Sequence, residues 1–376
     1  MIAPYGFAAP AAIAFGPDVR LQALTAAPAF GTRALVVTGA NAARAAWLTD
    51  GLRGAVADAL AAVKVARDFG ADVAIGIGGG AALDLAKAVA GLTREPGDPM
   101  DHLEVVGKGL PLTMDPLPLI AIPTTAGTGA EATRNAVLGV PERGRKVSLR
   151  DARLLPRLAL VDPLLTHGLP AGPTLATGLD AITQVIEPYL SAKATPMTDA
   201  LCRDAIARGL NALPRVMAAL AAGTEDAEAR ADMAHVSLMG GIALANAGLG
   251  AVHGLAGVLG GVTGGAHGAI CGALLGPVLA ANRAAMAARA PDLPAAARLE
   301  EVCALIAAAL GGTARDAPQT LADWARGAGL PGLTDLGFDP AAAGATASAS
   351  AASSSMKGNP LPLTEDELIA AMRAAS

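Results

Sequence analysis

Four short apolar runs in the first half of this 376-residue chain constrain its fold more than any other feature. Each run ends at glycines or at a proline next to polar residues, and Ala/Leu-rich helix-like segments separate the first three. Strands that read as continuous apolar runs are typical of a parallel sheet with both faces covered. The runs are residues 34–38, 73–77, 119–122 and 158–161.

The pattern changes after Asp162. From Pro173 to the end, the chain consists of long Ala/Leu-rich segments without a convincing strand. Its length also favours two domains over one compact core. We therefore predict an α/β domain over residues 1–162 and an all-helical domain over residues 163–376. Within the second, the Ala/Ser-rich residues 341–355 suit either a helix or a loop.

The composition indicates a well-buried globular protein, because 53% of the residues are hydrophobic and 16% are charged. A net charge of −5 without a Lys/Arg cluster predicts neither a nucleic-acid nor a membrane partner. The three cysteines are widely spaced, which fits a reducing compartment. The N-terminus lacks the basic start of a secretory signal, so we expect a cytoplasmic protein.

Residues 241–282 contain no Asp, Glu, Lys or Arg, yet they include His253 and His267. The recurring glycines argue against a membrane span, which requires about 20 continuous apolar residues. A buried imidazole needs a partner for its nitrogens, and a single one is more often a hydrogen-bonded core residue; two weaken that interpretation. Glycines between Gly260 and Gly265 should break the helix and let the histidines converge from different elements.

A carboxylate precedes these histidines at Asp180, one helical turn before Gln184. One carboxylate and two imidazoles make an open site suited to Zn²⁺ or Fe²⁺, with a position left for a substrate oxygen. We predict that Asp180, His253 and His267 are the catalytic residues and the metal ligands, with Gln184 as a further candidate ligand.

A glycine-rich turn over residues 78–80 joins the second apolar run to a helix-like segment. Such a turn places free backbone N–H groups and the positive end of a helix where a pyrophosphate can bind. On motif grounds alone, a tight connection without a ligand is an equal alternative. Asp84 and Lys87 follow at helical spacing, either as a surface ion pair or at the ligand-binding end of the sheet.

A second polar loop, over residues 123–131, follows the third apolar run. Its hydroxyl groups and glycines lie at the carboxyl edge of the predicted sheet, where ligands bind in α/β proteins. The alternative is a polar cap before the next helix. Two such loops on neighbouring strands predict a dinucleotide site.

Together these segments resemble the iron-containing (group III) alcohol dehydrogenase family over nearly the whole chain. Residues 78–87 are similar to its GGGSxxDxAK cofactor motif, with Ala81 in place of Ser, and residues 123–131 are similar to its PTTAGTGSE motif. Residues 178–184 and 252–268 resemble its DAxxH and H…HG metal segments, including their order and separation.

The resemblance implies a Rossmann-like α/β domain followed by an all-α domain, as in dehydroquinate synthase. It also implies an oxidoreductase that transfers a hydride between NAD(P)H and a small aldehyde or ketone, with a metal polarising the carbonyl group. A homodimer is expected, because the family tends toward dimers. The cofactor-binding residues that we predict are Gly39, Asn41, Gly78, Gly79, Gly80, Asp84, Thr124, Thr125, Thr128 and Lys146.

Three positions depart from the family pattern. Gln184 occupies the place of a histidine ligand, and a neutral amide oxygen is a poor substitute for imidazole on Fe²⁺. Related glycerol dehydrogenases and dehydroquinate synthases resemble the pattern with three protein ligands, so we prefer Zn²⁺, then Fe²⁺, then a metal-free protein. Gly257 replaces another histidine, which argues for a proton relay through water or ribose hydroxyls. Gly39 stands where NAD-specific members usually place Asp, which favours NADP, with NAD as the alternative.

Three other functions remain open. A maleylacetate reductase would reduce an oxo acid, for which Arg134, Arg145 and Lys146 offer cations. A dehydroquinate synthase-like cyclase would need several basic residues near the metal segments, and none lies beside them. A nucleotide-binding protein without catalysis would explain Gln184 and Gly257, but it would not explain why the three ligands are present.

Overall fold

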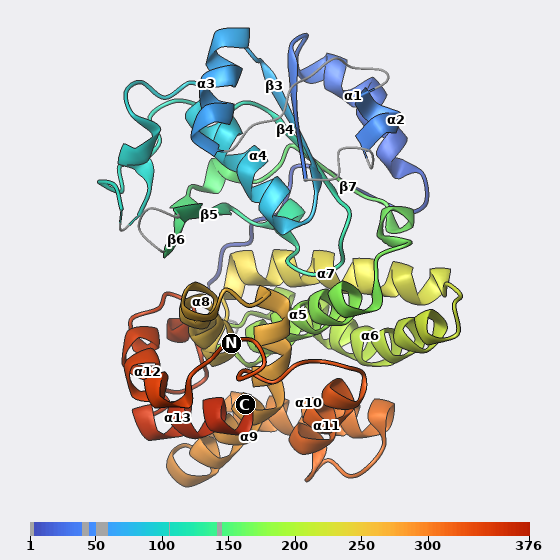
Figure 1. The fold of residues 1–376 in the computed structure, drawn as a ribbon, viewed down its shortest axis with the longest axis vertical. Helices are drawn as coiled ribbons and strands as arrows, with labels where there is room; N and C mark the ends of the chain where they lie inside the picture. Colours follow the sequence, from blue (N-terminus) through green and yellow to red (C-terminus); the bar gives the residue numbers. More distant parts are fainter. Residues whose placement is uncertain (1–3, 40–44, 50–58, 105, 141–144) are drawn as a thin grey trace. The chain divides into compact units, whose positions relative to one another are not determined.

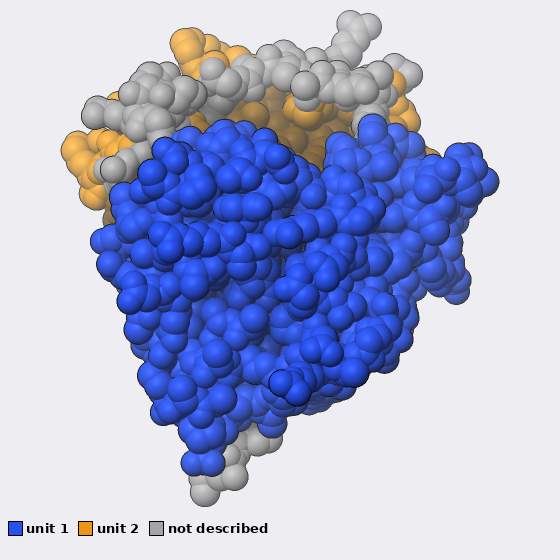
Figure 2. Space-filling view, turned by 60° about the horizontal axis from the view of Figure 1, so that its bottom comes forward, with its two compact units in different colours: residues 1–7, 126–128, 168–376 blue, residues 8–125, 129–167 orange. Residues whose placement is uncertain are grey.

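A computed structural model describes residues 4–39, 45–49, 59–104, 106–140 and 145–376 (Figure 1). The chain divides into two compact units, which Figure 2 shows in different colours. The α/β unit comprises Ala8–Thr125 and Gly129–His167, and the helical unit comprises Met1–Phe7, Ala126–Thr128 and Gly168–Ser376. The largest buried hydrophobic cluster belongs to the helical unit, and separate clusters cover the sheet of the α/β unit.

The α/β unit is built on a five-stranded parallel sheet with the order β1-β7-β4-β3-β2. The four apolar runs form four of these strands, which confirms the predicted parallel sheet. β1 was not predicted, because three residues are too few to show a periodic pattern. The strands are β1 (Ile13–Phe15), β2 (Ala34–Thr38), β3 (Val73–Gly78), β4 (Leu119–Pro123) and β7 (Leu158–Val161).

Helices cover both faces of this sheet (Figure 1). On one face, Leu35 and Val37 belong to a cluster with residues of α3 (Ala59–Phe69) and α4 (Gly80–Leu92). On the other, Val36, Ile75 and Ile77 cluster with residues of α1 (Ala23–Phe30) and α2 (Ala46–Thr49). Successive side chains of a strand point to opposite faces. Burial of both faces therefore explains why these strands contain apolar residues without alternation.

An antiparallel pair, β5 (Asn135–Val140) and β6 (Arg145–Arg150), packs against α4 and was not predicted. Ala136, Leu138, Val147 and Leu149 point into the same core as α4. Alternate residues are buried here, since one face alone packs on the core, while Val137 on the other face is 39% exposed. Short 3₁₀ helices complete the connections: η1 (Val19–Gln22), η3 (Pro99–His102), η4 (Ala130–Ala132), η6 (Ala152–Leu154), η7 (Pro163–Thr166), η8 (Pro340–Ala342) and η9 (Met356–Gly358).

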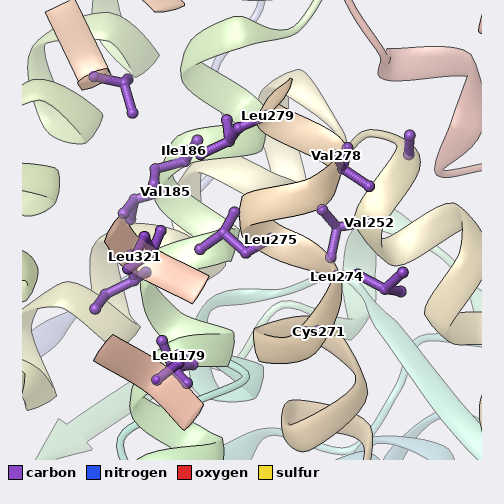
Figure 3. Packing of buried hydrophobic residues seen from close by; sticks show 14 of the residues in the cluster. Leu179, Val185, Ile186, Val252, Cys271, Leu274, Leu275, Val278, Leu279 and Leu321 are labelled. Carbon is purple, nitrogen blue, oxygen red and sulfur yellow. The ribbon is translucent and has the colours of Figure 1, made fainter. Parts of the chain in front are cut away.

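Residues 168–376, all of which the structure describes, form helices and no strand, as predicted. Most of α5 is buried, and its side chains Leu179, Val185 and Ile186 lie in the same core as Leu275 and Leu279 of α9 (Figure 3). The helices are α5 (Ala171–Leu190), α6 (Pro196–Ala221), α7 (Ala227–Ala247), α8 (Ala251–Thr263), α9 (His267–Arg289), α10 (Pro294–Leu310), α11 (Ala317–Gly327), α12 (Ala343–Ala351) and α13 (Glu365–Ala374).

Helix α9 is long and apolar enough to cross a membrane, with a mean hydropathy of 1.4 in its most apolar window. However, 67% of that window is buried within the protein. Leu274, Leu275, Val278 and Leu279 are among its buried side chains and lie on more than one side of the helix (Figure 3). These are the properties of the core helix of a globular unit.

The glycines after α8 break the helix, as predicted. α8 ends at Thr263, Gly264 adopts a left-handed conformation with φ of 68°, and α9 begins at His267. The start of α9 then packs tightly on α5, because a Cβ added at Gly268 would lie 2.4 Å from the Ala176 carbonyl oxygen. The break gives His253 and His267 separate helices, and the close packing brings His267 to α5.

The contact at Gly268 yields a test of this packing. We expect Gly268→Ala to push α9 away from α5 and to destabilise the helical unit by about 1–3 kcal/mol, as overpacking does. Gly257→Ala is the matched control, because it also replaces a helical glycine, but a Cβ there meets no atom of the described residues within 4 Å. Thermal unfolding measures both variants. Equal unfolding temperatures for the two would contradict the tight contact.

Candidate functional site

Four side chains of the helical unit bring their donor atoms together. Asp180, His253, His267 and Cys271 each offer one ligand atom, and these atoms all lie within 4.8 Å of one another. Asp180 Oδ1 is 3.3 Å from His253 Nε2 and 3.9 Å from His267 Nε2. The side chains of Asp180, His253 and Cys271 are buried, whereas that of His267 is 37% exposed. The structure thus places the three predicted ligands in one cluster, with access from one side.

A second carboxylate sets the orientation of the His253 ring. Glu187 Oε2 lies 2.7 Å from His253 Nδ1, and Glu187 Oε1 accepts a hydrogen bond from the Val252 N–H at 2.7 Å. A carboxylate can only accept, so Nδ1 carries the proton of this bond. In the neutral imidazole, Nε2 then presents its lone pair to Asp180.

Two buried acceptors therefore face each other at the centre of the cluster. Neither Asp180 Oδ1 nor His253 Nε2 has a hydrogen-bond partner among the described residues. Burying unpaired acceptors is costly, and two lone pairs that face each other also repel. Either a proton on His253 Nε2 or a metal ion between the two atoms removes both costs. This donor set of carboxylate oxygen, imidazole nitrogens and sulfur fits a divalent metal ion.

In the cluster, burial and the neighbouring charged or hydrogen-bonding groups shift the pKa values of Asp180 and His253 in opposite directions. Burial raises the pKa of Asp180, but the nearby His267, His253 and Cys271 outweigh burial and leave that pKa below its ordinary value. Burial lowers the pKa of His253, whereas Cys271, Asp180 and Glu187 together raise it well above its ordinary value. The surroundings of the imidazoles thus favour positive charge, which a metal ion supplies when it displaces the protons.

Gln184, the further candidate ligand, makes a hydrogen bond through its amide nitrogen. Its Nε2 donates a 2.6 Å hydrogen bond to the carbonyl oxygen of Thr128, a residue predicted to bind cofactor. The sequence analysis assigned no role to Glu187 or Cys271. Their spacing offered a weak signal, because Glu187 follows Asp180 by two helical turns and Cys271 follows His267 by one.

A separate cavity of about 300 Å³ lies at the carboxyl ends of β2, β3 and β4. Four predicted cofactor-binding residues line it, namely Gly39, Gly78, Gly79 and Thr124. Gly78 has φ of 153°, and a Cβ there would lie 2.7 Å from that of Ala82, so only glycine fits. The cavity thus lies at the carboxyl ends of parallel strands, where ligands bind in α/β proteins.

Three more predicted cofactor-binding residues, Gly80, Thr125 and Asp84, belong to the same α/β unit. Gly80 begins α4, and the Thr125 hydroxyl lies 3.4 Å from a Cβ added at Gly79. The Asp84 carboxylate contacts Lys87 Nζ at 3.0 Å and accepts from the Val137 N–H at 3.1 Å, which links α4 to β5. Asn41 lies outside the described residues, as does the side chain of Lys146 in β6.

Sequence comparison assigns the chain to a family. The sequence model "Iron-containing alcohol dehydrogenase" matches residues 54–163, and "Fe-containing alcohol dehydrogenase family, C-terminal" matches residues 174–376. The chain belongs to the iron-containing alcohol dehydrogenase family, whose members bind NAD(P) and a divalent metal, typically iron. The predicted family and fold are confirmed.

Individual relatives support the assignment to this family. "Probable alcohol dehydrogenase EutG" of Escherichia coli is 42% identical over 201 residues, which cover 54% of this chain and 49% of that protein. The chain thus matches about half the length of its curated relatives. A solved 1,3-propanediol oxidoreductase superposes with a TM-score of 0.86 at 28% identity, covering 100% of both chains. Sulfoacetaldehyde reductase from Bifidobacterium kashiwanohense, solved with NAD⁺, gives 0.84 at 25% identity, covering 99% of each chain.

The carboxyl group of Glu131, at the end of the polar loop over residues 123–131, is buried. Glu131 lies in η4, is 2% exposed, and its Oε1 has no hydrogen-bond partner among the described residues. Burial raises its pKa to about 7, against a smaller opposing effect of its own backbone N–H and of Lys87. The carboxyl is therefore costly to ionise in the folded protein.

This shift predicts a pH-dependent stability. Unfolded Glu131 loses its proton near its ordinary pKa and folded Glu131 only near 7, so the folded protein loses stability as the pH rises between these values. We expect Glu131→Gln to stabilise the protein by up to about 3 kcal/mol at about pH 8, with little effect at about pH 5. Thermal unfolding at both pH values measures this. Glu104→Gln, at a half-exposed carboxylate of the same unit, is the control, and an equal gain at both pH values would refute the shift.

Proposed function

We propose that the protein is an NAD(P)-dependent alcohol dehydrogenase that interconverts small aldehydes or ketones and the corresponding alcohols. The observation that carries this proposal is the buried convergence of Asp180, His253 and His267, with two unpaired acceptors facing each other. Such a set has little use in a protein that only binds nucleotides. The names of the relatives and the cavity at the sheet edge support the same function.

Asp180, His253 and His267 would hold the metal, with Zn²⁺ preferred over Fe²⁺. When bound, the metal supplies a Lewis acid for a carbonyl oxygen, and the nicotinamide supplies or accepts the hydride. The partly exposed edge of His267 leaves the cluster open to a small ligand. Glu187 acts as a positioning residue, because its hydrogen bond fixes the tautomer and direction of the His253 ring.

The cofactor preferred on these grounds is NADP. Gly78 and Gly79 would let the backbone approach a pyrophosphate at the start of α4, while Thr124 offers a hydroxyl group beside it. Gly39 lines the same cavity without a carboxylate, so nothing at this position repels a 2′-phosphate. Gly257 offers no imidazole as a proton carrier, which supports a relay through water or the ribose hydroxyls.

We further propose a cytoplasmic homodimer. Among the strands that the structure describes, β1 pairs with β7 alone and stands at the end of the sheet order. Its residue Ile13 is 38% exposed. An apolar edge strand is a template for pairing with another chain, which supports a shared N-terminal strand.

Loss of a ligand tests the role of the metal. We expect His253→Ala to lower turnover of short aldehydes by at least about 100-fold, because losing even a residue that positions a ligand typically costs 10–100-fold. NADPH binding, measured by fluorescence, should change little, since the cavity belongs to the other unit. His235→Ala is the control, at a partly exposed histidine of α7 that contacts Asp204. Full activity in His253→Ala would disprove the role of the metal.

The cofactor preference is tested at Gly39. A Cβ there meets no atom of the described residues within 4 Å, so an Asp at this position clashes with none of them. We expect Gly39→Asp to weaken NADPH binding about tenfold or more relative to NADH, since like charges lying close together cost more than about 1.4 kcal/mol. Gly39→Asn, a neutral side chain of the same size, should leave the ratio nearly unchanged. An equal loss of affinity for both cofactors in Gly39→Asp would count against the proposal.

A further inference from the structure

We infer that Cys271 is a fourth metal ligand, which completes an Asp–His–His–Cys site in this chain. The inference rests on the metal site of the proposed function and extends it to a residue that the family pattern does not assign. Its basis is the position of the Cys271 sulfur relative to the three other donor atoms.

Cys271 reaches the cluster by helical spacing. It follows His267 by one turn of α9, so both side chains lie on the same face of that helix. Its Sγ is 3.7 Å from His267 Nε2, and the residue is fully buried. The side chain therefore enters the cluster from within the core, whereas His267 reaches it from the exposed side.

The distances fit tetrahedral coordination. Metal–nitrogen and metal–oxygen bonds of about 2.0 Å and a metal–sulfur bond of about 2.3 Å place neighbouring ligand atoms roughly 3.3–3.6 Å apart. The measured separations are 3.3 Å for Asp180–His253, 3.7 Å for His267–Cys271 and 3.9 Å for His267–Asp180. The remaining pairs of donor atoms also lie within 4.8 Å, so the four side chains would move closer together on binding one ion.

Gln184 explains why a ligand from α9 is needed. The position one turn after Asp180 carries an amide whose nitrogen donates to the Thr128 carbonyl. An amide N–H donates and cannot bind a cation, and the Gln184 carbonyl oxygen is a neutral ligand, weaker than a thiolate. The fourth ligand, which resemblance to the family would place on α5, is therefore supplied by α9.

A cysteine ligand also bears on the choice of metal. Thiolate is a soft ligand, and mixed nitrogen–sulfur tetrahedral sites select Zn²⁺. Asp180 and an ionised Cys271 together carry two negative charges, which balance a divalent cation in a buried site where unbalanced charge is costly. The site thus favours zinc for reasons of both softness and charge.

The test uses the full-length protein and zinc itself. X-ray absorption of the zinc-loaded wild type should show one sulfur neighbour at about 2.3 Å beside nitrogen and oxygen neighbours. With cobalt in place of zinc, a sulfur-to-metal charge-transfer band should appear in the near ultraviolet. Cys271→Ser should abolish both signals and weaken zinc binding, measured by competition with a chelator, by about 100-fold or more.

Cys202→Ser and Cys303→Ser are the matched controls, because both cysteines are buried in the same unit outside the metal cluster. Both controls should keep the sulfur signal and the zinc affinity. A wild type that binds zinc through nitrogen and oxygen alone would overturn the inference and leave the proposed function intact. A wild type that binds no zinc, cobalt or iron would overturn both. The wild-type spectrum decides the matter even if Cys271→Ser fails to fold.

Discussion

The hydrogen bond between Glu187 and His253 is the interaction on which the candidate site depends. It holds the proton on Nδ1 and turns the Nε2 lone pair toward Asp180 Oδ1, 3.3 Å away. Two acceptors at that distance repel in a buried setting unless a proton or a metal ion lies between them. The surrounding core keeps them together, because α5, α8 and α9 bury their apolar faces against one another. Affinity for a cation thus follows from packing that is already in place.

Hydrogen bonds also fix the first turn of α8, which carries His253. The Val252 N–H donates to Glu187 Oε1, and the Ala251 N–H donates to Asn359 Oδ1 at 3.1 Å. These are N–H groups that a helix cannot satisfy internally at its first turn. Gly250 makes the arrangement feasible, because a Cβ there would lie 2.9 Å from Glu187 Oε1. The position of His253 therefore depends on residues far away in the sequence, including the C-terminal segment around Asn359.

The sequence predicted those elements whose burial leaves an unambiguous mark. β2, β3, β4 and β7 are buried on both faces and contain uninterrupted apolar residues, whereas β5 and β6 bury one face and show only a short alternation. Asp180, His253 and His267 were identified because ionisable groups stand out in apolar segments. Cys271 was not identified, since a cysteine in such a segment is most often an ordinary core residue.

The spacing of residues in the sequence did not predict how deeply they are buried. Asp84 and Lys87 are three residues apart, as a surface ion pair would be, yet Lys87 is fully buried. Its Nζ contacts Asp84, the Thr133 hydroxyl and the Asn135 carbonyl, so that one cation joins α4 to η4 and β5. Helical spacing defines a face of a helix, but only the packing of the next element decides whether that face meets water.

The net charge of the metal site depends on whether Cys271 is a ligand. With Asp180 and a thiolate at Cys271 both bound, a divalent ion would carry no net charge, whereas a carboxylate with neutral imidazoles would leave it one positive charge. A neutral centre is easier to bury but withdraws less electron density from a carbonyl oxygen. An exchange of histidine for cysteine would therefore strengthen retention of the ion at the expense of its Lewis acidity. Such a site would rely more on positioning the substrate than on polarising it.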